Sequence, residues 1–351
     1  MHIYYHTDAL PAFRKAVVTI GTFDGVHSGH AQILEQLRQE AARIGGETVI
    51  VTFYPHPRRV VQGGSADIRL LNTLEEKIQL LSWQRIDHLV VVPFTEAFSL
   101  QTAEEYVREF LLRKFDPHTV IIGYDHRYGR GRQGDYHLLE QFSRSDGFEL
   151  QEIPVHLLDA VSVSSTRIRE AIGKADIGEA NRLLGYPYFF SGPVAEGKRL
   201  GRTIGYPTAN IVVGNDEKLI PADGVYAVEV AMVDRETITL TAPTTVVAPA
   251  AAPWEAARFG GMMNIGMRPT VDGRERTIEV NIFDLKEDLY GRQLRVMVKG
   301  WLRGEQKFGG LEELKAQLGR DVAEARGMLG RGGWCGRAGG EGVAEVRGCG
   351  R

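Results

Sequence analysis

The segment AVVTIGTFDGVHSGH, residues 16–30, joins an apolar run to a glycine-rich turn that carries two histidines. AVVTI has the pattern of a buried strand, and the glycines break it before a stretch with helical periodicity begins. Such a turn leaves free backbone N–H groups at the positive end of the helix dipole. The segment therefore predicts a strand, a turn and a helix, with an anion site beside His27 and His30.

Three interpretations of His27 and His30 remain open on these residues alone. A zinc site needs further ligands, but no H-E-x-x-H pattern occurs and the two cysteines, Cys335 and Cys349, lie in the C-terminal tail. Two imidazole donors at a helix start also suit phosphate oxygens. For an isolated H-x-x-H, simple helix capping is the more economical interpretation.

The alternation of apolar strands and amphipathic helices continues to about residue 186, which is typical of a doubly wound parallel sheet. Strands are expected at 16–22, 47–53, 88–93, 119–123 and 149–155. Helices are expected at 31–44, 74–84, 103–114, 136–145, 165–173 and 177–184.

From residue 191 to about 300 the pattern changes to short strands without crossover helices, which favours an antiparallel β-barrel or sandwich. A closing amphipathic helix is expected at 311–329. The domains predicted are thus 1–186 and 187–329. The Ala, Pro and Thr-rich segment 239–259 is expected to be a loop or flexible insertion, and the glycine-rich tail 330–351 to be disordered.

The composition is that of a soluble globular protein. The 351 residues carry a formal net charge of −3 with 25% charged residues, which argues against a nucleic-acid partner. The N-terminal residues lack a leader pattern and no 18-residue apolar run occurs, so no membrane partner is expected. With only two cysteines, a reducing cytoplasm is the expected location. Nothing in the sequence specifies an oligomeric state.

Two further polar segments attract attention. In VSSTRIRE, residues 163–170, Ser164 or Ser165 is expected to cap a short helix that presents Arg167 and Arg169, although a well-capped surface helix is the simpler interpretation. In GPVAEGKRLGRTIGYPTAN, residues 192–210, the glycines permit close approach to phosphate. Thr208 and Asn210 lie two apart on a strand start, where their oxygens suit Mg²⁺ with a nucleotide.

The strand 277–283 divides into an apolar face and a polar face, and Glu279 lies on the polar one. Alternate polar residues on a strand usually face water. Periodicity alone therefore favours a solvent-exposed Glu279.

GTFDGVHSGH resembles the G-x-F-D-G-x-H-x-G-H signature of nucleotidyltransferases, in the version typical of prokaryotic bifunctional riboflavin kinase/FMN adenylyltransferases. TFYPHP (52–57), GYDHRYGRGRQGD (123–135) and VSSTRIRE are similar to further motifs of that family, with His126 and Tyr128 where phenylalanines are common. The resemblance implies a Rossmann-like adenylyltransferase domain in which His27 and His30 are catalytic. The ATP-binding residues that it implies are Gly21, Phe23, Asp24, His27, His30, Ser164, Ser165, Thr166 and Arg169, with Asp125 on a flavin and nucleotide loop.

The second half resembles the riboflavin kinase of the same family. GYPTAN (205–210), MNIGMRPT (263–270), TIEVNIFDLKEDLYGR (277–292) and WLRGEQKF (301–308) match its motifs in order. The resemblance implies Glu279 as the catalytic base and Thr208 and Asn210 as ligands of Mg²⁺. It also implies Gly197, Gly201, Gly205, Thr208 and Asn210 as ATP-binding residues.

The leading hypothesis is a bifunctional enzyme that converts riboflavin to FMN and FMN to FAD, with ATP and Mg²⁺ in both steps. Two alternatives stay open: a chain in which one activity survives, more readily the adenylyltransferase because 239–259 interrupts the kinase half, and a flavin-binding regulatory protein.

Overall fold

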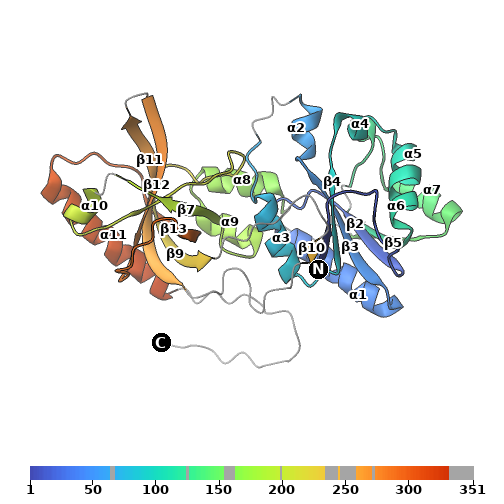
Figure 1. Ribbon diagram of the computed structural model, residues 1–351, viewed down its shortest axis with the longest axis horizontal. Coiled ribbons are helices and arrows are strands. Elements are labelled where there is room, and N and C mark those ends of the chain that lie inside the picture. Colours follow the sequence, from blue (N-terminus) through green and yellow to red (C-terminus); the bar gives the residue numbers. More distant parts are fainter. Residues whose placement is uncertain are drawn as a thin grey trace.

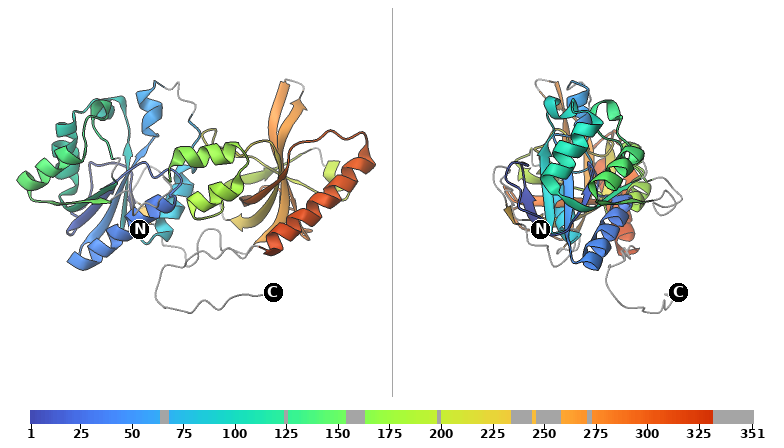
Figure 2. Two further views of the ribbon diagram at one scale, coloured as in Figure 1. Left: turned by 180° about the vertical axis from the view of Figure 1, so that it is seen from behind. Right: turned by 90° about the vertical axis from the view of Figure 1, so that its right-hand side faces the viewer.

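The computed structural model describes residues 1–63, 68–123, 126–153, 163–197, 200–233, 244–245, 258–270 and 273–331. Figure 1 shows a sheet with its helices in one half of the molecule and a β-barrel with a long helix, α11, in the other. Helices α8 and α9 lie between the two halves, and the view from behind in Figure 2 shows the same order.

The sheet has the strand order β10-β1-β4-β3-β2-β5-β6, and every pairing except that of β10 is parallel. Its strands are β1 (His2–Tyr4), β2 (Ala16–Ile20), β3 (Glu47–Tyr54), β4 (His88–Pro93), β5 (Pro117–Gly123), β6 (Glu149–Ile153) and β10 (Thr244–Thr245). The predicted doubly wound sheet is confirmed.

Helices lie between these strands and after β6. They are α1 (Ser28–Ile44), α2 (Pro57–Val61), α3 (Leu74–Trp83), α4 (Glu96–Ser99), α5 (Ala103–Glu105), η1 (Tyr106–Leu112), α6 (Arg113–Phe115), η2 (Arg130–Arg132), α7 (Tyr136–Asp146), α8 (Ser165–Gly173) and α9 (Ile177–Leu184). The predicted helix 103–114 is present, but its centre is the π-helix η1. Hydrophobic periodicity does not distinguish a π turn from an α turn within one short helix.

Six strands form a closed barrel in the order β11-β12-β8-β7-β13-β9, with antiparallel pairing throughout. They are β7 (Phe189–Ala195), β8 (Ala209–Ile211), β9 (Gly224–Val233), β11 (Phe259–Thr270), β12 (Gly273–Ile282) and β13 (Gln293–Arg303). The short helix α10 (Leu200–Thr203) precedes β8, and α11 (Leu311–Arg331) packs on β9, β11 and β13. The predicted barrel and closing helix are confirmed.

Alternate strand residues divide between two apolar clusters, as expected for a sheet that is covered on both faces. Val18 and Val49 pack on the side of α5, η1 and α7, whereas Val17 and Ile50 pack on the side of α1, α3, α8 and α9. The second cluster continues into the barrel interior, where it includes Val228. The two halves are therefore joined by one apolar core.

Three expectations need correction. No strand was expected before residue 16, but β1 pairs with β4; a three-residue strand is too short for its periodicity to be recognised. Within the expected loop 239–259, Thr244 and Thr245 form the edge strand β10, which pairs with β1. Phe259 begins β11, Arg258 precedes it, and the rest of that segment lies outside the described residues. In the tail, Gly330 and Arg331 belong to α11, and residues 332–351 lie outside the described residues.

Candidate active sites

The turn after β2 has an unusual backbone. Phe23 (φ 47°), Gly25 (φ 91°) and Val26 (φ 37°) are left-handed, which non-glycine residues rarely adopt. At Gly25 a Cβ would also lie 2.7 Å from Cδ1 of Leu71, so this position needs glycine. Neighbouring side chains hold the turn in this conformation: Thr52 Oγ1 and Lys77 Nζ donate to the carbonyl of Thr22 at 3.2 and 2.8 Å.

This turn brings the two predicted histidines into contact. The rings of His27 and His30 stack with centroids 3.7 Å apart, and Phe23 packs against His30 at 5.0 Å. His27 occupies the N-cap position of α1, but its side chain accepts no capping hydrogen bond. In the described part of the chain, the buried Nδ1 atoms of both rings have no hydrogen-bond partner. Helix capping therefore does not explain these side chains, and two orphaned ring nitrogens fit an absent ligand.

Both histidines are neutral near pH 7. Burial and, to a smaller extent, the charge of Arg169 lower the pKa of His27 to about 4. Burial also lowers the pKa of His30 well below its ordinary value, with contributions from His27 and Lys77. Each neutral ring can donate one N–H, and an incoming polyanion would favour the protonated form.

Asp24 connects this turn to the segment VSSTRIRE. Its partner there, Arg169, lies 145 positions further along the chain. The carboxylate of Asp24 is 2% exposed and pairs with the guanidinium of Arg169. Ser165 Oγ donates to the backbone carbonyl of Asp24 at 2.9 Å. The expected proximity of the two motifs is thus present in the structure.

The start of α8 matches the sequence expectation. Ser164 is its N-cap, and its Oγ accepts from the amide of Arg167 at 3.3 Å. Thr166 is exposed on the first turn. Arg167 forms an ion pair of 2.7 Å with Glu179, and this pair links α8 to α9.

Two basic residues near the turn were missed. Lys77 is buried on α3, and burial lowers its pKa to about 8 while Asp24 opposes the shift. Burial, followed by the charges of Lys77 and Arg169, lowers the pKa of His56 to about 4. The motif TFYPHP could have indicated His56, whereas Lys77 lies within an ordinary amphipathic helix, where no local pattern distinguishes it.

The structure describes residues 123 and 126–135 of the motif GYDHRYGRGRQGD. Asp125 lies outside the described residues. Tyr128 is buried, stacks on Tyr106 with centroids 5.0 Å apart and donates to the carbonyl of Asp135 at 3.2 Å. Tyr128 is therefore a core residue.

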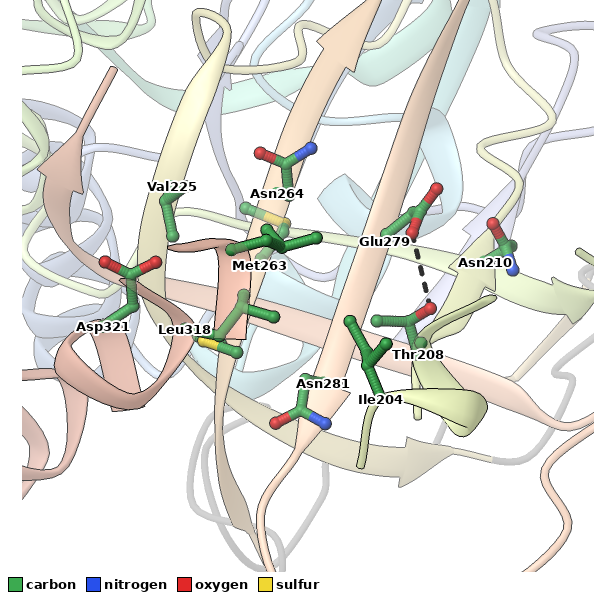
Figure 3. A pocket seen from close by; sticks show the side chains of 13 residues that line it. Ile204, Thr208, Asn210, Val225, Met263, Asn264, Glu279, Asn281, Leu318 and Asp321 are labelled. Carbon is green, nitrogen blue, oxygen red and sulfur yellow. Dashed lines mark hydrogen bonds between the residues drawn. The ribbon is translucent and has the colours of Figure 1, made fainter. Parts of the chain in front are cut away.

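A cavity of about 230 Å³ lies between the barrel and α11. Figure 3 shows Glu279, Thr208 and Asn210 at one side of it, with a hydrogen bond of 3.4 Å from Thr208 Oγ1 to Glu279 Oε2. The register of β12 on β8 places Glu279 opposite Asn210. Glu279 thus lines a cavity, and the expectation of a simple solvent-facing residue is wrong.

The three glycines of this half that the resemblance implies in ATP binding have different environments. Gly201 lines the cavity. Gly197 lies against Asn210, since a Cβ added there would be 2.7 Å from Cγ of that residue. Gly205 has φ 88° with no atom near its Cβ position, and it is not among the cavity residues.

Two cavity residues were not assigned roles from the sequence. Asn281 Nδ2 donates to the carbonyl of Pro207 at 2.7 Å, which fixes the start of the Thr208 segment. Asp321 of α11 is 1% exposed and accepts two hydrogen bonds from Arg303, at 2.9 and 2.7 Å. α11 therefore closes the cavity through a bidentate ion pair.

The comparisons with known proteins agree with this geometry. Residues 10–167 match the family model of FAD synthetase, and residues 184–329 match that of riboflavin kinase. A bifunctional riboflavin kinase/FMN adenylyltransferase of Escherichia coli is 35% identical over 90% of this chain and 93% of its own length. The protein of the same description from Listeria monocytogenes is 35% identical over 93% of this chain and 98% of its own length.

A crystal structure described as a macrolide-efflux protein from Streptococcus pneumoniae has the same overall arrangement. Its TM-score is 0.79 at 27% identity, with 92% of this chain and 98% of that chain covered. Among the described residues, no helix has the length and apolar character needed to cross a membrane. By its identity and coverage with the curated relatives, this chain belongs to the bifunctional riboflavin kinase/FMN adenylyltransferase family.

Proposed function

We propose that this chain phosphorylates riboflavin to FMN in the barrel half and adenylylates FMN to FAD in the sheet half. One observation carries both assignments: motifs far apart in sequence meet as pairs of complementary side chains. Arg169 meets Asp24 beside the two histidines, and Thr208 meets Glu279 in the cavity.

In adenylyl transfer, a phosphate oxygen of FMN attacks the α-phosphorus of ATP, and pyrophosphate leaves. Negative charge spreads over the phosphate oxygens, so the chain must align two anions and stabilise that charge. His27 and His30 donate N–H groups from the start of α1, whose dipole adds a positive field. Arg169 binds the polyphosphate from the other side. We further assign Gly21, Phe23, Asp24, Ser164, Ser165 and Thr166 to the ATP-binding surface, with Asp125 in the nucleotide loop.

In the kinase reaction, the 5′-hydroxyl of riboflavin attacks the γ-phosphorus of ATP and ADP leaves. Glu279 accepts the hydroxyl proton as the attack proceeds. The apolar side chains of Leu314 and Leu318 of α11 line the same cavity as Glu279. The glycine segment containing Gly197, Gly201 and Gly205 is assigned to the ATP phosphates.

Mg²⁺ is the proposed metal in both reactions. The hydroxyl of Thr208 and the amide oxygen of Asn210 line the same cavity as Glu279, and such hard oxygens are what Mg²⁺ prefers. When bound with ATP, Mg²⁺ neutralises phosphate charge. Within the described ranges there is no cluster of three or more His, Cys, Asp or Glu residues that could hold a metal ion. The proposed magnesium ion enters the site together with ATP.

The proposed domains are 1–186 for the adenylyltransferase and 187–329 for the kinase. The match to FAD synthetase, 10–167, lies within the first, and the match to riboflavin kinase, 184–329, begins three residues before the second. The proposed partners are riboflavin, FMN and ATP, without nucleic acid or membrane. The proposed compartment is the cytoplasm, which the low cysteine content supports.

The alternative that only one activity survives assumed that residues 239–259 disrupt the kinase half. The barrel is closed nevertheless, because β9 and β11, which flank this segment, pair directly from Val230 and Phe259 onward. This pairing favours two working sites. The regulatory alternative predicts binding of flavin without turnover.

The test is to incubate the protein with riboflavin and Mg-ATP and to separate riboflavin, FMN and FAD over time. FMN should appear first and FAD afterwards. His30→Ala should abolish FAD formation and leave FMN formation, whereas Glu279→Gln should abolish FMN formation and leave adenylylation of supplied FMN. Equal loss of both activities in either variant would contradict the assignment of two separate sites.

A further inference from the structure

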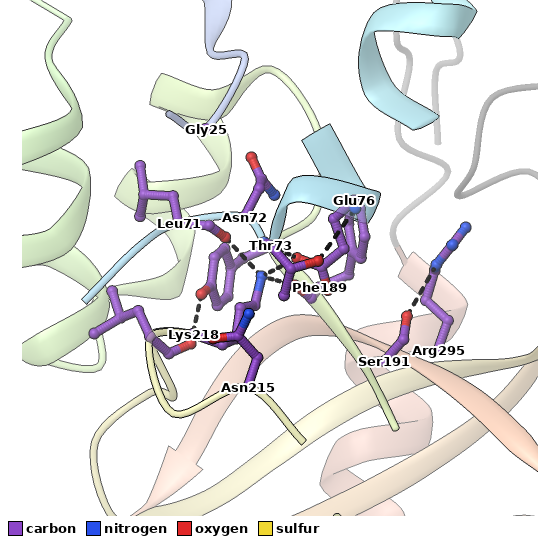
Figure 4. Close-up of polar contacts among 12 residues, drawn as sticks. Gly25, Leu71, Asn72, Thr73, Glu76, Phe189, Ser191, Asn215, Lys218 and Arg295 are labelled. Carbon is purple, nitrogen blue, oxygen red and sulfur yellow. Dashed lines mark hydrogen bonds and ion pairs between the residues drawn. The ribbon is translucent and has the colours of Figure 1, made fainter. Parts of the chain in front are cut away.

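Lys218 is a buried lysine of the barrel half to which the proposed chemistry assigns no role. Its side chain is 0% exposed. Its ammonium donates to the carbonyls of Leu71 and Phe189 at 2.6 and 2.7 Å and to Glu76 Oε2 at 2.6 Å (Figure 4). The three donors of the ammonium thus have three acceptors, which is the condition for burying such a charge.

The acceptors belong to both halves of the molecule. Phe189 begins β7 of the barrel, whereas Leu71 and Glu76 belong to the segment that enters α3 of the sheet half. The backbones also pair here: Leu70 donates to the carbonyl of Glu217 at 2.6 Å, and Leu219 donates to the carbonyl of Leu70 at 2.8 Å. Lys218 and the backbone of its two neighbours therefore bind Leu70 and Leu71 to the barrel half.

The other side of residues 70–72 faces the turn after β2, which carries Asp24. The amides of Leu71 and Asn72 donate to Asp24 Oδ1, at 2.9 and 3.4 Å. Asp24 pairs with Arg169, and Arg169 Nε donates to the carbonyl of Arg69 at 2.7 Å. The same short segment thus contacts the barrel on one side and orients Asp24 and Arg169 on the other.

We propose that Lys218 is a positioning residue of the adenylyltransferase site, which holds the carbonyl of Leu71 so that the neighbouring amides orient Asp24 and, through it, Arg169. The inference rests on the proposed adenylylation of FMN. It makes part of the sheet-half site dependent on a side chain of the barrel half, although Lys218 touches no substrate.

The test measures the two activities separately in the full-length chain, with riboflavin or FMN as the acceptor. In Lys218→Met, the KM for ATP in adenylylation should rise about tenfold or more, because a small misplacement of a binding group is costly. The kinase kcat and KM should stay at wild-type values. Lys299→Met is the matched control, since Lys299 pairs with Glu229 in the same barrel and lies outside the junction described above; it should change neither activity.

A double variant distinguishes the loss of positioning by Lys218 from the effect of leaving the buried carboxylate of Glu76 unpaired. Lys218→Met leaves Glu76 without its cation, and adding Glu76→Gln removes that charge while keeping a residue that can serve the capping box with Thr73. If Lys218 positions Leu71, the double variant should retain the raised KM. Recovery in the double variant, an unchanged KM in Lys218→Met, or equal loss of both activities would overturn the proposal. Failure of the wild-type protein to form FAD would instead refute the proposed function.

Discussion

The contact between Gly197 and Asn210 gives a sharp test of the kinase site. A Cβ added at Gly197 would lie 2.7 Å from Cγ of Asn210. Carbon atoms in contact prefer about 3.5–4.0 Å, so Gly197→Ala should displace the Asn210 amide by about 1 Å. The fold should tolerate this change, because the end of one side chain is what must move.

The consequence for catalysis should be much larger than that for stability. A displacement of about 1 Å in a group that positions substrate costs about 100-fold in rate, which corresponds to about 2.7 kcal/mol of transition-state stabilisation. We expect the kcat/KM for riboflavin phosphorylation to fall by about this factor in Gly197→Ala. Adenylylation of FMN should not change.

The assay follows FMN formation from riboflavin and Mg-ATP, with the midpoint of thermal unfolding measured in parallel. Gly214→Ala is the matched control, because no atom lies near its Cβ position, and it should keep wild-type kinase activity. Kinase activity in Gly197→Ala within about threefold of wild type would refute the reasoning that Asn210 must be held in place to bind Mg-ATP.

Three further predictions concern Arg169, Asn281 and the buried histidines. Arg169→Lys should raise the KM for ATP in adenylylation about tenfold, because Arg169 reaches the carbonyl of Arg69 and the carboxylate of Asp24 with two separate nitrogens of its planar guanidinium, a geometry that the single nitrogen of lysine does not reproduce; an unchanged KM would contradict this. Asn281→Leu should lower the free energy of unfolding by about 1 kcal/mol in a denaturant titration and weaken ATP binding by the kinase only, since the hydrogen bond to Pro207 is lost. Acidification from pH 6.5 to about 4 should lower the free energy of unfolding. Folding lowers the pKa of His27 and of His126 to about 4, so the unfolded chain binds more protons than the folded chain between these pH values. A free energy of unfolding that stays constant over this range would refute the buried, neutral state of these rings.

Local sequence was sufficient for most elements of the fold. The helices at 165–173 and 177–184 begin and end where periodicity and capping residues predict, because these signals act within a few residues. The short β1 and the π-helix η1 were missed because neither differs locally from its alternatives. The strand β10 was missed because a two-residue strand exists only through pairing with a distant edge.

By itself, the sequence determined the two-part architecture, the motif residues and the chemistry that they resemble. Only the tertiary structure decided that His27 and His30 are buried, stacked and neutral, because desolvation depends on what packs around a ring and is not a local property. It also decided that Glu279 lines a cavity, since Leu314, Leu318 and Asp321 of α11 line the same cavity. The link from Lys218 through Leu71 to Asp24 could not be predicted, because its residues lie 147 and 47 positions apart and meet only when the two halves pack together.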